Sequence, residues 1–165
     1  MPENAQLKEV TVYTDGACKG NPGPGGYCAV LVHGEKRKEI VGGYRLTTNN
    51  RMEMMAAISA LEALRGRCKV TVWTDSKYLC DSVELGWAKR WRSKGWVVKS
   101  GDKAANPDLW QRMLDLCETH DVKFKWLKGH AGHEENETCD RLSVAACTAE
   151  DLEIDEPFEL IHKSA

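Results

Sequence analysis

Two short segments with nearly the same pattern restrict the fold of this chain more than any other feature. Residues 10–14 read Val-Thr-Val-Tyr-Thr, and residues 70–74 read Val-Thr-Val-Trp-Thr. This alternation of β-branched and aromatic residues predicts a β-strand in each place. An aspartate follows each segment, Asp15 in the first case and Asp75 in the second. The predicted fold therefore has a carboxylate at the end of each of these two strands.

The elements predicted around these strands indicate an α/β fold. Residues 27–33 and 40–46 continue the first strand as an antiparallel meander, whereas residues 17–26 are too rich in Gly and Pro for a regular element. Helices and strands then alternate, starting with a helix whose cap is Asn49 or Asn50. A meander followed by this alternation is typical of an α/β domain with a mixed sheet flanked by helices. The segments predicted after the meander are 52–64, 70–74, 76–85, 108–120, 122–127 and 135–147.

Composition and charge limit the domain count and the partners. A chain of 165 residues, 42% of them hydrophobic, predicts one globular domain. Its seven cysteines include no C-x-x-C pair, which indicates reduced thiols rather than a disulfide scaffold or a zinc site. Residues 150–165 hold six acids and one base, so residues 1–149 carry a net charge of +3. We expect a single domain over residues 1–149 and a flexible acidic tail over residues 150–165. We also expect a cytoplasmic protein, because no segment has the pattern of an export signal or a membrane span, and we expect it to be a monomer.

One basic segment suggests a nucleic-acid partner. Residues 86–99 hold five bases, three tryptophans and no acid. Cationic side chains interleaved with aromatic rings are typical of surfaces that bind phosphates and stack on bases. We therefore expect the tryptophans of this segment to contact nucleic acid and the other three to lie in the core. The first group is Trp87, Trp91 and Trp96, and the second is Trp73, Trp110 and Trp126.

Four carboxylates stand at positions that could carry chemistry: Asp15, Glu53, Asp75 and Asp140. Ligand sites in α/β sheets lie beyond the strand ends, and carboxylates gathered there repel one another unless a divalent cation is bound. Each residue also has an ordinary structural interpretation. Asp15 fits a turn, Asp75 a helix cap and Glu53 a capping box, while a mid-helix Asp140 is unremarkable if it faces solvent. Spacing alone leaves both interpretations open.

Two histidines lie in a Gly-rich segment near the last predicted helix. His130 and His133 are three residues apart, but no cysteine or third histidine completes a zinc site with them. A loop histidine titrates near neutral pH and suits proton transfer. An idle surface position explains His130 equally well at this point.

Five segments, taken together, resemble a known family. They are residues 14–27 (TDGACKGNPGPGGY), 47–53 (TTNNRME), 74–76 (TDS), 128–133 (KGHAGH) and 136–140 (NETCD). In this order, the segments resemble the bacterial type I ribonucleases H, and the likeness extends from about residue 10 to residue 149. The resemblance implies the ribonuclease H-like fold, with a five-stranded mixed sheet flanked by helices.

The resemblance also implies a reaction. Members of this family are metal-dependent endonucleases that hydrolyse the RNA strand of RNA–DNA hybrids by a two-metal-ion mechanism, leaving 5′-phosphate and 3′-hydroxyl ends. It implies Mg²⁺, or Mn²⁺ in its place, with Asp15 bridging the two ions. Glu53 and Asp75 would bind one ion and Asp140 the other, with His130 as a proton shuttle. Two alternatives remain: a non-catalytic nucleic-acid-binding module, and a DNA-cleaving nuclease of the same fold.

The resemblance further implies a set of substrate contacts. Thr48 and Asn106 match a pocket for a phosphate of the DNA strand, but Leu46 stands where the family has an arginine. Arg45, one residue earlier, could replace that arginine only if the strand bulges. Lys77 stands where the family commonly has Gln. The remaining implied contacts are Gly16, Cys18, Asn21, Asn49 and Asn50 near the RNA strand, and Trp87, Lys89, Arg90, Trp91, Arg92 and Lys94 near the DNA strand.

Overall fold

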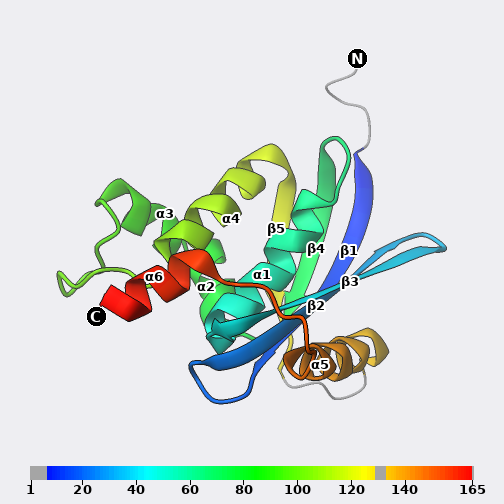
Figure 1. Ribbon diagram of the computed structural model, residues 1–165. Coiled ribbons are helices and arrows are strands. Elements are labelled where there is room, and N and C mark those ends of the chain that lie inside the picture. The colour runs from blue at the N-terminus through cyan, green and yellow to red at the C-terminus, as the bar shows by residue number, and fades with distance from the viewer. Residues whose placement is uncertain (1–6, 129–132, 165) are drawn as a thin grey trace.

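The sheet is five-stranded and mixed, as predicted. The computed structural model describes residues 7–128 and 133–164. The strands lie in the order β3-β2-β1-β4-β5, with β1, β2 and β3 antiparallel and β4 and β5 parallel to β1 (Figure 1). Strands that follow one another in the first part of the chain pair as hairpins, and the later strands are joined by helical crossovers. The strands are β1 (Lys8–Cys18), β2 (Gly23–His33), β3 (Lys36–Thr47), β4 (Cys68–Thr74) and β5 (Asp121–Trp126).

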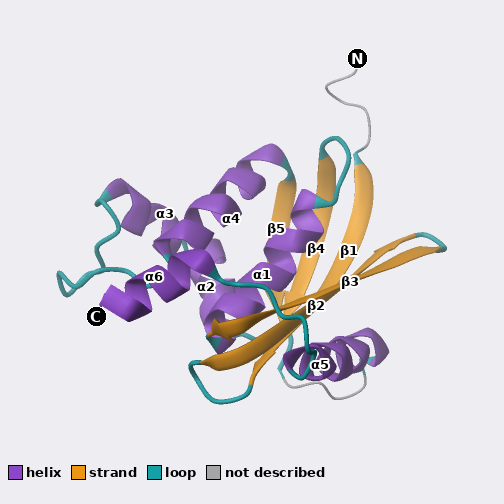
Figure 2. Ribbon diagram, viewed as in Figure 1, coloured by secondary structure: helices purple, strands orange, loops and turns teal. Residues whose placement is uncertain are grey.

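Helices cover both faces of the sheet (Figure 2). On one face α1 packs against β1 and β2 and also contacts α4, while α2 packs against β4 and β5. On the other face α5 packs against β1 and β2. No helix among the described residues has the length and apolar composition needed to cross a membrane. The helices are α1 (Asn49–Glu62), α2 (Lys77–Glu84), α3 (Trp87–Ser93), α4 (Pro107–Thr119), α5 (Glu134–Cys147) and α6 (Glu156–Ser164).

The central helix α1 has its N-cap before both predicted caps, one residue before Asn49 and two before Asn50. Its N-cap is Thr48, whose hydroxyl accepts a hydrogen bond from the backbone N–H of Arg51. Both asparagines that we expected as caps, Asn49 and Asn50, instead belong to the first turn. Most of the helix is buried, because α4 and the sheet enclose it from two sides. Its position is therefore fixed along nearly its whole length.

The Gly- and Pro-rich segment differs from its prediction. Residues 17–26 are not one loop: β1 continues to Cys18, and β2 already begins at Gly23. Gly20 lies in the turn between the two strands with φ +76°, whereas Gly23, Gly25 and Gly26 are needed for close packing. A Cβ atom on Gly26 would lie 2.4 Å from the backbone oxygen of Ser143 in α5. Glycine at this position therefore allows α5 to lie directly against β2.

The acidic segment after residue 149 is not a flexible tail, contrary to the prediction. It forms helix α6 on the same side of the sheet as α1 and α4 (Figure 1). Asp155 and Glu159 are only 5% exposed. Asp155 accepts hydrogen bonds from Thr47 and from the guanidinium of Arg51, and these contacts hold the segment in place. The acidic composition predicted that these side chains are solvated, but hydrogen bonds and ion pairs with other parts of the chain hold them against the protein.

Three tryptophan predictions differ from the structure: Trp73, expected in the core, is only half-buried, and Trp91 and Trp126 differ in opposite directions. Trp91, expected on the surface, is 8% exposed in the core, where its ring stacks on Tyr78 and meets Trp110 edge to face. Trp126, expected in the core, is 42% exposed at the end of β5. Trp91 lies on the inner side of the short helix α3, which the sequence pattern did not predict, while its exposed basic neighbours point outward. A basic composition therefore did not show which rings face solvent.

Candidate active site

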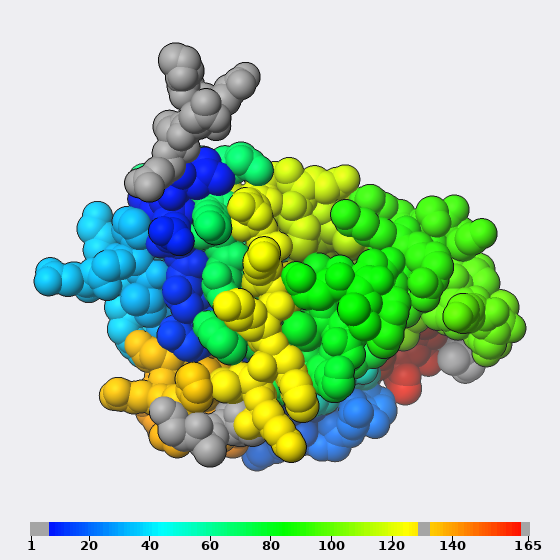
Figure 3. All heavy atoms as spheres, turned by 180° about the vertical axis from the view of Figure 1, so that it is seen from behind, coloured from blue at the N-terminus to red at the C-terminus, as the bar shows by residue number. Residues whose placement is uncertain are grey.

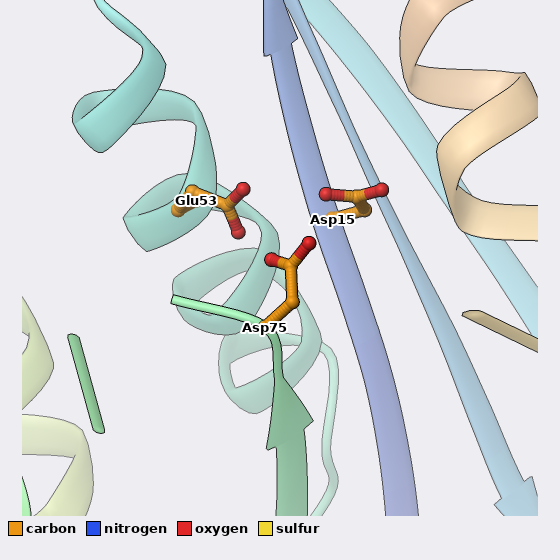
Figure 4. A group of neighbouring side chains, drawn as sticks. All are labelled: Asp15, Glu53 and Asp75. Atoms are coloured by element: carbon orange, nitrogen blue, oxygen red, sulfur yellow. The ribbon is translucent and has the colours of Figure 1, made fainter. Parts of the chain in front are cut away.

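Three of the four predicted carboxylates form a cluster at one edge of the sheet. Asp15 lies on β1, Glu53 on α1 and Asp75 directly after β4, and their side chains face one another (Figure 4). One carboxylate oxygen from each lies within 4.8 Å of the others. Asp15 and Glu53 are 3% and 5% exposed. The interpretations as a turn and as a capping box are thus wrong for these two, because Asp15 is inside a strand and Thr48 is the cap.

Strand pairing places the two aspartates side by side. The parallel register of β1 and β4 pairs Tyr13 with Trp73. Two residues later each of these segments has an aspartate, Asp15 and Asp75. The hydroxyl of Thr14 also donates to the backbone oxygen of Trp73 at 2.9 Å. The two similar segments of the sequence are therefore neighbours in the sheet. Their matching aspartates come together for that reason.

Close contact between β1 and α1 brings in the third carboxylate. A Cβ atom on Gly16 would lie 2.6 Å from the backbone nitrogen of Glu53 and 2.7 Å from the carbonyl carbon of Met52. Only glycine permits this approach. Gly16 was predicted as a substrate contact, but its visible effect is to let Glu53 reach Asp15. Its N–H also donates to Oδ1 of Asp15 at 2.9 Å.

Burial and like charge work against ionisation of this cluster. Desolvation and the negative charges of Asp15 and Asp75 raise the pKa of Glu53 well above its usual value. Oε2 of Glu53 has no hydrogen-bond partner among the described residues. A buried carboxylate oxygen aimed at two other carboxylates is costly for an apoprotein and well suited to a hard divalent cation, which takes oxygen ligands. The donor set therefore fits a metal ion.

We predict that Glu53→Gln stabilises the metal-free protein. Because the pKa of Glu53 is raised in the folded state, folding loses stability as pH rises above the usual pKa of a glutamate. A neutral amide removes that loss at pH 7, so Tm should rise by roughly 2–4 °C, or about 1 kcal/mol. Thermal unfolding at pH 7 without divalent ions measures this. The variant should also lose much of the Tm increase that added Mg²⁺ gives the unmodified protein. An unchanged response to Mg²⁺ would contradict a role for Glu53 in metal binding.

The remaining two predicted catalytic residues are less well defined. Asp140 is exposed on α5 and is not part of the three-residue cluster. The helix is anchored one residue earlier, where the thiol of Cys139 donates to the backbone oxygen of Tyr13 on β1. Asp140 thus lies on a helix fixed to the strand that carries Asp15, and its role as a ligand stays a prediction. His130 lies outside the described residues.

Several predicted substrate contacts are brought together near the start of α1. The side-chain oxygen of Asn21 accepts a hydrogen bond from the N–H of Asn49 at 3.1 Å, and both residues are exposed, as is Asn50. Cys18 is half-buried, with its thiol directed to the backbone oxygens of Gly23 and Thr47. The exposed asparagines are thus available to a ligand.

Two residues of the predicted phosphate pocket have partners within the protein, and their role toward phosphate stays a prediction. A bulge between β2 and β3 is present, because Gly23 pairs with Thr47 while Gly25 pairs with Tyr44. Arg45, within that bulge, makes two 2.9 Å hydrogen bonds to Glu159 of α6. Asn106 instead accepts a hydrogen bond from Arg51 at 3.2 Å. A buried arginine, and not Arg45, therefore connects α1 with Asn106.

The basic segment is in part available to a polyanion. Lys89, Arg90 and Lys94 are exposed on α3 and just after it. Arg92 lies 3.5 Å from Glu118, so its charge is partly offset. Trp87 is half-buried and packs against the core, and Trp91 is buried. Exposed cations thus form this surface, and Trp91 does not line it.

Sequence reasoning missed two residues around the cluster. Arg51, two positions before Glu53, is 2% exposed and donates to Asp108 and Asp155. Trp126 donates from its indole N–H to the backbone oxygen of Asp75 at 3.1 Å. The TTNNRME segment contains Arg51, but its acidic partners lie more than 50 residues away in the sequence. Spacing along the chain gave no signal for either contact.

Comparison with known proteins gives a consistent result. The RNase H family model matches residues 7–148. Ribonuclease H from Rippkaea orientalis is 57% identical over 156 residues, which cover 94% of this chain and 96% of the relative. Ribonuclease H from Desulforamulus reducens is 56% identical over 153 residues, covering 93% and 96% of the two chains. The level of identity is high along nearly the full length of both relatives.

Solved structures agree with these relatives. The crystal structure of LC9-RNase H1, a type 1 RNase H, superposes with a TM-score of 0.77 at 32% identity, covering 87% of this chain and 74% of that one. LC11-RNase H1, solved in complex with an RNA/DNA hybrid, has the same fold, with a TM-score of 0.63 at 24% identity and coverage of 84% and 96%. Because sequence, fold and clustered carboxylates agree, we conclude that the chain belongs to the RNase H family.

Proposed function

We propose that this protein hydrolyses the RNA strand of RNA–DNA hybrids, leaving 5′-phosphate and 3′-hydroxyl ends. The observation that carries this proposal is the group of buried Asp15, buried Glu53 and half-buried Asp75, from each of which one oxygen lies within 4.8 Å of the others. The relatives with 57% and 56% identity are ribonucleases H, which supports the same activity here. A binding module without catalysis has no need to gather three carboxylates at the cost of their mutual repulsion.

We further propose that Mg²⁺ is the natural metal, with Mn²⁺ as a substitute. Carboxylate oxygens are the ligands that both ions prefer. Asp15, Glu53 and Asp75 face one another (Figure 4), and in our assignment Glu53 and Asp75 would be ligands of one ion, Asp140 of the other, and Asp15 of both. When bound, two such ions activate a water molecule and stabilise the leaving oxygen in an in-line displacement. No covalent nucleophile is then required.

The protein's own residues hold this site rigid and position the substrate. Gly16 and the β1–β4 pairing fix the carboxylates, so little rearrangement is needed on binding. Asn21 and Asn49 offer amide groups near the cluster, and such groups can bond the ribose 2′-hydroxyl that distinguishes RNA from DNA. His130 would take up or release a proton as the product leaves. The exposed cations of α3 would hold the DNA strand, so affinity should fall steeply with salt.

We assign these roles to one catalytic domain, for which the sequence predicted residues 1–149 and to which the segment after residue 149 also belongs. Arg51 of α1 and Asp155, just before α6, form a buried ion pair at 2.7 Å. The segment after residue 149 therefore supports the helix that carries Glu53. It is an integral part of the folded unit and does not behave as a separate solvated tail.

A panel of substrates tests the proposed function. A hybrid, a DNA duplex and an RNA duplex of one sequence should be incubated at one salt concentration with Mg²⁺, and product ends should be mapped. We expect cleavage of the hybrid's RNA strand alone, at least about 100-fold faster than either duplex, because both RNA-specific and DNA-specific contacts are satisfied only there. Cleavage of the DNA duplex would favour a DNA nuclease of the same fold. Binding without cleavage would favour a non-catalytic module.

A further inference from the structure

An exposed tryptophan stands at the rim of the carboxylate cluster. Trp126 ends β5 and is 42% exposed, although Phe124, two residues earlier on the same face of the strand, is 4% exposed in the core. Large aromatic rings contribute most to stability when they are buried, as Trp110 on α4 is at 0% exposure. Trp126 leaves much of its surface to solvent beside a site built for chemistry.

The ring of Trp126 is held in place at both its edge and its face. Its indole N–H donates to the backbone oxygen of Asp75 at 3.1 Å. The ammonium of Lys77 lies 5.4 Å from the ring centroid, and Lys77 is itself fixed by Asp81 at 2.8 Å. A ring that is already ordered loses little conformational entropy when a ligand stacks on it. Figure 3 shows β5, in yellow, running along the molecular surface beside the green residues of α2, the helix that begins at Lys77.

The position of this ring suits one kind of ligand. Its hydrogen bond goes to the backbone of Asp75, so it adjoins the place where a scissile phosphate would bind. Bases inside a hybrid are paired and stacked on one another, so an exposed aromatic ring can stack only on an unpaired base. The Lys77 side chain is 61% exposed and supplies a cation for the adjoining phosphate, although Asp81 offsets part of its charge.

We propose that Trp126, together with Lys77, forms a stacking site for an unpaired nucleotide of the strand that is cleaved. Hybrids that continue into a single-stranded RNA extension should then bind more tightly than blunt hybrids. This inference rests on the proposed function, since it takes the carboxylates as the site of RNA cleavage. It adds a substrate class, the junction between a hybrid and single-stranded RNA.

The other interpretation is that Trp126 only positions Asp75 through its indole N–H. The two interpretations differ in what they require of the side chain. Stacking needs an aromatic ring and no N–H, whereas positioning needs the N–H. Trp126→Phe keeps a ring and loses the donor, and Trp126→Ala loses both. A second lysine–tryptophan pair, with Lys125 5.5 Å from the ring of Trp73, provides a matched control.

The ratio of two dissociation constants, that of the blunt hybrid divided by that of the extended hybrid, separates these interpretations when it is measured for each variant. Dissociation constants should be measured by fluorescence anisotropy, at one salt concentration without divalent ions, for a blunt hybrid and for the same hybrid extended by three unpaired nucleotides. The extension is placed at one end of one strand at a time, so that each end of the RNA strand and each end of the DNA strand is tested separately. We expect an RNA extension at one end to tighten binding by about tenfold, the amount typical of one stacked base. Because each ratio compares two substrates on one variant, any shift of Asp75 affects both alike.

The expected ratios are specific. Trp126→Ala should bring the ratio close to one, Trp126→Phe should keep most of it, Lys77→Gln should lower it, and Lys125→Gln should leave it unchanged. Equal binding of all substrates by the unmodified protein, a gain from DNA extensions alone, or an unchanged ratio in Trp126→Ala would overturn the stacking site. If the blunt hybrid is still hydrolysed with Mg²⁺ in those cases, the proposed function stands. If the unmodified protein keeps the expected ratio but does not hydrolyse the blunt hybrid, the proposed function is refuted and the stacking site is not.

Discussion

Asp15→Asn should lower kcat for hybrid hydrolysis by at least about 10³-fold while hybrid binding stays within a few-fold of the unmodified protein. Asp15 is central to the cluster, being a neighbour of Asp75 through the β1–β4 register and of Glu53 through the contact at Gly16. An amide of the same shape keeps the packing but loses the charge that a bridging ligand supplies. Steady-state kinetics with Mg²⁺ and anisotropy without it measure the two quantities.

The chain offers a matched control for this substitution. Asp121 is an exposed aspartate at the start of β5, at the opposite end of that strand from Trp126. Asp121→Asn removes the same charge from the same sheet and should leave kcat unchanged within about twofold. Retained hydrolysis by Asp15→Asn would show that the cluster is not the catalytic centre. Equal losses in both variants would indicate a general effect of charge.

Asp155→Ala should lower the free energy of unfolding by about 3 kcal/mol, which corresponds to roughly 6–12 °C in Tm for a domain of this size. Asp155 accepts hydrogen bonds from Thr47 at the end of β3 and from Arg51 on α1, and all three residues are buried. Without it, the Arg51 guanidinium loses one of its two carboxylate partners and keeps Asp108 and the neutral Asn106, and the hydroxyl of Thr47 loses its acceptor. Chemical denaturation at pH 7 measures the change.

Neighbouring acids of the same segment provide the comparison. Glu156→Ala removes an exposed carboxylate one residue later and should change stability by no more than about 0.5 kcal/mol. If Asp155→Ala were as mild as Glu156→Ala, the segment after residue 149 would not support the fold. Activity gives a second readout, because loosening the start of α1 should lower kcat through Glu53 more than it raises KM for the hybrid.

The same network has a pH dependence with a definite sign. Burial raises the pKa of Asp108, but hydrogen bonds and the charge of Arg51 outweigh burial, so that the pKa of Asp108 lies below its usual value. The Asp108 contribution to stability is therefore complete above the pKa of an unfolded aspartate and is lost as pH falls through the lower, folded value. Asp108→Asn should abolish this part of the acid-induced loss of stability.

Local sequence determined most of the architecture. The alternating pattern of residues 10–14 and 70–74, and the lengths of the helical segments, specify the strand and helix order, because each element must bury an apolar face. The motif resemblance implied the five-stranded sheet, which the structure confirms, and a group of four carboxylates, of which Asp15, Glu53 and Asp75 lie together in the structure. Chain position alone could not show that Asp15 lies inside β1. That depends on pairing with β2, which extends the strand past the Asp-Gly pair to Cys18.

Tertiary structure decided which charged and aromatic side chains are buried. The acidic composition of residues 150–165 predicted a solvated tail, yet Arg51 and Arg45 provide partners for Asp155 and Glu159 and hold α6 in place. The basic composition around Trp91 predicted an exposed ring, yet α3 turns that ring toward Tyr78 and Trp110. Arg51 is buried because of acidic partners that lie more than 50 residues away in the chain. Trp91 is buried because of the orientation of the short helix α3. The sequence therefore determined most of the elements and the chemistry of the carboxylates, while three-dimensional packing decided which polar and aromatic groups remain available to a substrate.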